Sequence, residues 1–231
     1  MINNYNDFIT KLLEVGFSGA VFGKDDGVFG LFRYGWGVED GIEWHTDNPE
    51  TDPWIWRMRV LEERNDIAYS KLFFKKAGYI TKEWYPYFLA VRRYGKTLDE
   101  DYYDGYISHI GKRIYDAIAE NKRLALHEIK SHIGLKKENK SKFDSALTEL
   151  QMKMYITMCG QQHIRSFSGI EHGWSATVFC TTEDFFGEEV FLEAALYPTD
   201  EAERIITKQI YKLNQNAQDG KITKFINPYR R

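Results

Sequence analysis

The fold is decided by residues 109–160, which read HIGKRIYDAIAENKRLALHEIKSHIGLKKENKSKFDSALTELQMKMYITMCG. Apolar residues in this stretch recur every three or four positions, beginning with Ile110, Ile114 and Ile118. This spacing is typical of helices that bury one face. It predicts three successive helices separated by short polar turns, over about residues 104–120, 126–133 and 140–152.

Two segments with alternating apolar residues follow the third predicted helix. The first runs over Met154–Met158 and the second over Trp174–Cys180, with the long glycine-bounded loop Gly160–Gly173 between them. Alternation is typical of strands, so the two segments predict a hairpin with a long loop. Three helices followed by such a hairpin are the plan of a winged helix-turn-helix. We expect this module in the middle third of the chain, over residues 104–186.

The N-terminal part, residues 1–103, is rich in aromatic residues and glycine. Amphipathic spacing predicts a helix over residues 5–15, and Thr51-Asp52-Pro53 is typical of the start of a second helix. The glycines between these two helices indicate short strands and tight turns. The charged, turn-rich segment Lys96–Asp104 is the predicted boundary of the winged helix.

A third region, residues 187–231, completes the chain. Pro198 opens a helix with clean apolar spacing, and the tail Lys221–Arg231 is expected to fray. The predicted fold class is therefore α+β. It combines an aromatic-rich α+β N-terminal region (1–103), a winged-helix domain (104–186) and a C-terminal helix with its tail (187–231).

The composition is that of an ordinary globular protein, with 43% hydrophobic and 28% charged residues. No stretch approaches the roughly 18 apolar residues of a membrane span, and the N-terminus lacks the pattern of a signal peptide. We therefore expect a cytoplasmic protein without a membrane partner; its oligomeric state is left open. Cys159 and Cys180 fall on different faces of the two predicted strands. Both are expected to be buried and not joined by a disulfide.

Charge is distributed unevenly along the chain. The net charge of −3 argues against indiscriminate binding of nucleic acid. Residues 111–165, however, carry 11 Lys and Arg against 6 Asp and Glu, whereas residues 1–110 carry 13 against 18. The basic island coincides with the predicted winged helix, and this favours duplex DNA as the partner.

In a winged helix-turn-helix the third helix enters the major groove of DNA. The candidate nucleic-acid-binding residues lie on this helix, on the turn before it and in the wing: Lys136, Lys137, Lys140, Lys142, Ser145, Thr148, Gln162 and Arg165. Lysine and arginine contact phosphates, while hydroxyl and amide groups bond to phosphates or bases. A basic helix face is also often merely solvated. The alternative is a protein–protein or small-ligand binding module that uses the winged helix as a scaffold.

Several aromatic and basic segments in the first half of the chain are distinctive: Asp52–Arg57, Ala68–Phe74, Gly78–Ile80, Trp84–Phe88 and Arg92-Arg93. In this order they resemble the AlkZ-related family, and the resemblance extends over about residues 15–190. Members of this family are small relatives of winged-helix DNA glycosylases, which repair alkylated and crosslinked DNA. The resemblance implies DNA binding through winged helices and, in the glycosylases proper, cleavage of an N-glycosidic bond.

The resemblance does not carry a catalytic site over to this chain. The glycosylases have a Gln-x-Gln or Gln-x-Asp motif in an N-terminal winged-helix repeat, whereas the first glutamine here is Gln151. Gln161 and Gln162 are adjacent and not spaced as in that motif. Catalytic residues are therefore not assigned. A relative that keeps the scaffold without the motif either binds DNA without cutting it or serves another role.

A third hypothesis is a hydrolase with its site in residues 35–60. Four carboxylates lie there beside tryptophans, namely Glu39, Asp40, Glu43 and Asp52. Carboxylates and aromatic walls suit an extruded base, but solvated acids and core tryptophans are the favoured interpretation. The six histidines have no spacing that suits a metal, and no phosphate-binding loop is present. Neither a metal nor a cofactor is expected.

Overall fold

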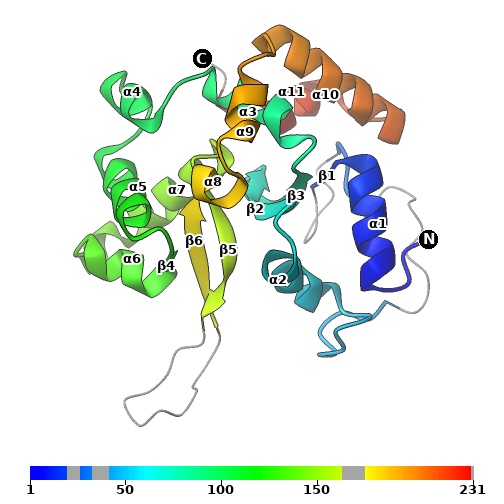
Figure 1. Cartoon of the computed structure of the whole chain (residues 1–231), viewed down its shortest axis with the longest axis horizontal. Helices are drawn as coiled ribbons and strands as arrows, with labels where there is room; N and C mark the ends of the chain where they lie inside the picture. Colours follow the sequence, from blue (N-terminus) through cyan, green and yellow to red (C-terminus); the bar gives the residue numbers. More distant parts are fainter. Residues whose placement is uncertain (20–26, 33–41, 163–174, 230–231) are drawn as a thin grey trace.

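One antiparallel sheet runs through the structure, a computed structural model that describes residues 1–19, 27–32, 42–162 and 175–229. Within these residues the strand order is β1-β3-β2-β5-β6-β4 (Figure 1). The strands are β1 (Phe17–Ser18), β2 (Ile67–Phe73), β3 (Lys76–Thr81), β4 (Leu124–Ala125), β5 (Ile156–Gln162) and β6 (Ala176–Thr181). Tyr69 of β2 pairs with Met158 of β5, and this contact joins the two halves of the sheet.

The N-terminal and C-terminal helices surround strands β1 to β3 (Figure 1). They are α1 (Tyr5–Val15), α2 (Pro53–Glu63), α3 (Tyr85–Arg93), α10 (Thr199–Leu213) and α11 (Asp219–Ile226). Their apolar faces form one hydrophobic core with the strands. The rings of Phe73 and Phe225 stack within it at 3.9 Å. The expectation of a fraying tail is therefore wrong for α11, because Ile222, Phe225 and Ile226 are buried in this core.

The middle of the chain builds a second hydrophobic core. Its helices are α4 (Leu98–Tyr103), α5 (His109–Asn121), α6 (Leu126–His132), the 3-10 turn η1 (Lys137–Asn139) and α7 (Lys140–Met152). Ile114 and Ile118 of α5 meet Ile129 of α6 and Phe143 of α7 in this core. The apolar stripes of the three predicted helices are thus confirmed as buried faces. After β6, α8 (Thr182–Phe186) and α9 (Glu189–Ala194) lead back towards α3.

The strands of the middle region follow a simple pairing. β6 lies between β5 and β4, and it pairs antiparallel with both. β4 comes between α5 and α6 in the chain and has only two residues, Leu124 and Ala125. The sequence did not predict it, because two residues are too few for a periodic pattern. Trp174 and the tip of the expected loop lie outside the described residues.

The predicted boundary segment Lys96–Asp104 is largely helical. Thr97 and Glu100 form a reciprocal capping box that starts α4. Asp101 of this helix is buried, and it accepts a hydrogen bond from the hydroxyl of Tyr155 at 2.8 Å. The segment thereby joins the second core, and the next helix begins at His109 and not near residue 104.

The two cysteines are buried and free, as expected, but they lie on the same side of the hairpin. Both belong to a small cluster with Ala125 and Val178. Thr157 of β5 pairs with Cys180 of β6. Cys159 lies two residues beyond Thr157, so alternation along β5 places it on the same face as Cys180. The register of the two strands, which the sequence does not show, therefore decides their common side. A hydrogen bond with Cys180 lowers the pKa of the Cys159 thiol.

No helix among the described residues is both long enough and apolar enough to cross a membrane.

Candidate nucleic-acid interface

The first two turns of α7 are exposed and basic. Lys140 and Lys142 are exposed together with Ser141 and Ser145, while Phe143 points into the second core. The first turn contains no acidic residue, and the N-cap makes no side-chain hydrogen bond to the helix. Positive charge at a helix N-terminus opposes the helix dipole. The two lysines therefore do not stabilise α7, and they leave its start electropositive.

A groove of about 630 Å³ lies between this face of α7, the β2–β3 hairpin and the C-terminal segment. Its lining includes Lys71, Lys75, Lys140, Ser141, Asp144, Ser145, Thr148, Glu149 and Tyr229. Two of its three lysines come from a part of the chain that the sequence did not assign to the interface. We refer to this feature as the basic groove, although Asp144 and Glu149 interrupt its positive charge.

The β2–β3 turn that carries Lys75 has an uncommon backbone. Phe73 pairs with Lys76, so Phe74 and Lys75 alone form the turn. Their φ angles are positive, 50° for Phe74 and 62° for Lys75. Such two-residue turns favour Asn-Gly, because larger side chains are strained there.

Thr148 is buried, although helical spacing placed it on the exposed face. It lies at the floor of the basic groove, where the Lys71 ammonium donates to its hydroxyl at 3.4 Å. The second half of α7 packs against β2. The hydroxyl of Ser70 donates to Gln151 Oε1 at 2.8 Å, and the backbone N–H of Lys71 donates to the same oxygen at 3.1 Å. Only the first half of α7 is therefore open to a ligand.

Replacing Gln151 with leucine is expected to lower the free energy of unfolding by about 1–3 kcal/mol, because Ser70 and the Lys71 N–H lose their shared acceptor. Urea denaturation measures this loss. The double variant Ser70→Ala/Gln151→Leu also removes the Ser70 hydroxyl, one of the two donors left without an acceptor, and should recover part of the lost stability. An unchanged unfolding midpoint for Gln151→Leu would contradict this role.

The remaining predicted residues flank the basic groove or lie on the hairpin. Lys136 and Lys137 are exposed just before α7, and Gln162 is exposed at the end of β5. Arg165 lies outside the described residues. Strands β5 and β6 lie between α6 and α2 in Figure 1. Near its described end, the Gln161 amide donates to Glu62 of α2 at 3.0 Å.

Two arginines of the first half, Arg92 and Arg57, donate hydrogen bonds to backbone carbonyls. Arg92 is buried and donates to the carbonyl oxygens of Leu72, Met152, Phe225 and Ile226 at 2.8–3.0 Å. Burial lowers its pKa to about 9, so it remains protonated at neutral pH. Arg57 lies over the Trp54 ring at 3.7 Å and donates to the carbonyl oxygen of the same residue at 2.8 Å. Both side chains are thus held by contacts within the protein.

The carboxylates proposed for a hydrolase have no catalytic arrangement in the described residues. Asp52 is buried as the N-cap of α2, where it accepts from the backbone N–H groups of Trp54, Thr46 and Asp47 at 2.8, 3.0 and 3.2 Å. Glu43 is exposed, and Glu39 and Asp40 lie outside the described residues. The part of the chain that the structure describes contains no group of three His, Cys, Asp or Glu side chains that could hold a metal ion.

The geometry defines an α+β protein with a basic groove beside an exposed helix start. A sequence profile described as AlkZ related matches residues 2–227. The match covers nearly the whole chain, and the chain belongs to the AlkZ-related family. The resemblance inferred from its aromatic and basic segments is thereby confirmed, over a longer range than expected. Neither a curated protein nor a solved structure matches the chain.

Proposed function

We propose that this member of the AlkZ-related family binds duplex DNA, and that its middle region is a winged helix. The order of elements supports the fold: α5, β4, α6 and α7 are followed by the β5–β6 hairpin, and β6 pairs with β4. The third helix of a helix-turn-helix module contacts the DNA groove, and α7 has this position in the chain.

The basic groove is the observation that carries this proposal. Lys71 and Lys75 line it beside Lys140, which begins α7. Lysines at the positive end of a helix dipole suit a phosphate. The hydroxyls of Ser141 and Ser145 are additional donors on the same lining.

The proposed contact is made mainly with the DNA backbone. Because the second half of α7 is packed against β2, few of its side chains remain to reach base edges. Lys136 and Lys137 before α7, and Gln162 and Arg165 of the proposed wing, add flanking contacts. Membership of the AlkZ-related family supports a role in DNA repair, and we propose recognition of the duplex without base excision. The absence of any glutamine before Gln151 and the structural use of Asp52 support this choice.

Fluorescence anisotropy of a labelled duplex across a salt series tests the proposal. Each phosphate contact contributes about 0.9 to the slope of log K against log salt concentration. We expect wild-type affinity to fall steeply with salt, and the slope to be shallower by about 1–2 in Lys71→Glu/Lys75→Glu.

The matched control is Lys208→Glu/Lys212→Glu, which reverses two exposed lysines on α10. It should bind as the wild type does. If the wild type does not bind at low salt, DNA binding is wrong; if both double variants lose affinity equally, the basic groove is not the contact.

A further inference from the structure

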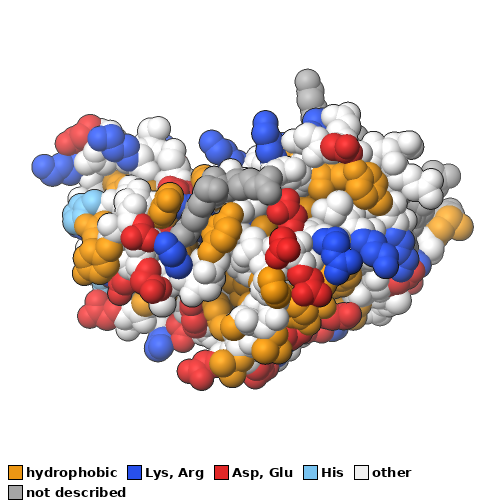
Figure 2. Space-filling view, turned by 90° about the horizontal axis from the view of Figure 1, so that it is seen from above, with side chains coloured by type: hydrophobic (Ala, Val, Ile, Leu, Met, Phe, Trp, Pro, Cys, Tyr) orange, Lys and Arg blue, Asp and Glu red, His pale blue; other side chains and the backbone are white. Residues whose placement is uncertain are grey.

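The segment after β6 is acidic and carries exposed leucines. Residues 182–203 contain 8 Asp and Glu and no Lys or Arg. Leu192 is 69% exposed and Leu196 is 75% exposed. Figure 2 shows hydrophobic side chains gathered among acidic ones over the lower part of one face. Single exposed apolar residues are ordinary, but a cluster of them marks an interaction surface.

A cleft of about 630 Å³ opens beside these leucines, between α3, α9 and the start of α10. Its walls are mostly apolar, with Leu89, Ala90, Phe191, Leu192, Tyr197 and Pro198 among the lining residues. The volume lies within the roughly 300–1,000 Å³ of pockets that bury a ligand. Several large apolar side chains can therefore enter the cleft.

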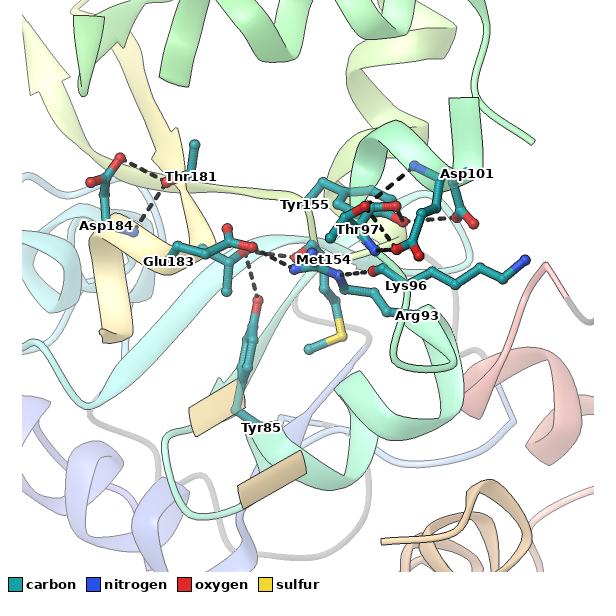
Figure 3. Close-up of polar contacts among 12 residues, drawn as sticks. Tyr85, Arg93, Lys96, Thr97, Asp101, Met154, Tyr155, Thr181, Glu183 and Asp184 are labelled. Carbon is teal, nitrogen blue, oxygen red and sulfur yellow. Dashed lines mark hydrogen bonds and ion pairs between the residues drawn. The ribbon is translucent and has the colours of Figure 1, made fainter. Parts of the chain in front are cut away.

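A rigid ion pair forms the polar part of the cleft. Arg93 donates to Glu183 Oε1 at 2.8 Å, and the two side chains point toward one another in Figure 3. The Arg93 guanidinium also lies over the rings of Tyr155 and Phe191, at 4.4 and 5.0 Å from their centres. Its side chain is only 8% exposed. The pair neutralises itself, so the interior of the cleft selects for apolar groups.

The rim of the cleft selects for positive charge. Glu188, the N-cap of α9, lies on the lining, and Glu193 lies on the same helix outside the lining; both side chains are exposed. The opposite lining includes Lys96, whose ammonium forms an ion pair with Asp104.

We propose that this cleft binds a basic amphipathic helix of a partner protein. The apolar face of that helix enters the cleft, and its lysines and arginines meet the acidic rim. Nucleic acid is excluded as the occupant by its own negative charge. The interaction goes beyond DNA binding and does not depend on it, because the cleft and the basic groove share no lining residue.

The test uses a fluorescein-labelled synthetic helical peptide of leucine and lysine only, with its leucines on one face, and measures its anisotropy on titration with the full chain. We expect saturable binding that weakens at least tenfold in Leu192→Ser/Leu196→Ser. Glu188→Gln/Glu193→Gln should weaken binding at low salt and make it less sensitive to salt. Leu13→Ser/Tyr211→Ser is the matched control, since it removes two exposed apolar side chains elsewhere.

Three outcomes would overturn the proposal. One is no binding by the wild type. Another is equal binding of a scrambled peptide of the same composition, whose leucines do not share a face. The third is a dimer in light scattering that dissociates in Leu192→Ser/Leu196→Ser, because the occupant would then be a second copy of this chain. All of these variants keep the basic groove, so a failure here leaves the DNA result unaffected.

Discussion

Reversing the charge of Lys140 and Lys142 together is expected to weaken binding of duplex DNA by roughly 100-fold at low salt. Both side chains are exposed in the first turn of α7, where they would meet phosphates. The variant replaces two attractive contacts with two repulsive ones. Because glutamate at a helix N-terminus favours the helix dipole, it should also fold at least as well as the wild type. Weaker DNA binding by this variant would then not be caused by unfolding.

Anisotropy at a fixed low salt concentration measures this loss, and thermal melting monitored by circular dichroism checks the fold. Lys208→Glu/Lys212→Glu again serves as the matched control, and it should retain wild-type affinity. Unchanged affinity in Lys140→Glu/Lys142→Glu would remove α7 from the interface. The wild-type protein, incubated with alkylated or crosslinked duplexes, is expected to release no base. Release of a base would contradict the proposal of binding without excision.

Replacing Arg92 with methionine is expected to lower the free energy of unfolding by about 3–5 kcal/mol. Arg92 is buried, and its guanidinium is the donor to four backbone carbonyls, on β2, at the end of α7 and on α11. Methionine fills part of the volume but donates to none of them. The side chain therefore connects three segments that the chain brings together from far apart.

Urea denaturation followed by tryptophan fluorescence measures the effect. Arg92→Lys keeps the charge but cannot reach all four carbonyls, so it should recover only part of the stability. Arg204→Met, on the exposed side of α10, should change stability by less than about 0.5 kcal/mol. If Arg92→Met lowers the free energy of unfolding by less than about 1 kcal/mol, the four carbonyl oxygens have found other hydrogen-bond donors, and the proposed role of Arg92 is wrong.

The basic groove could be predicted only in part. The exposure of Lys140 and Lys142 was expected from helical spacing, because Phe143 and its apolar neighbours turn the opposite face of α7 inward. Lys71 and Lys75 were missed. They lie in a strand and its turn, far from α7 in the sequence, and no local pattern connects them to it.

The sequence alone was enough to locate α6, α7 and most of α5 with their buried stripes, but not α4. Apolar periodicity is a local property, so α1 and α7 begin and end at the predicted residues. Periodicity shows which face of an element is buried, but not which element covers it. The contact of α7 with β2 therefore had to come from the tertiary structure. That contact buries Thr148, fixes Gln151 and leaves only the start of α7 open beside Lys71 and Lys75.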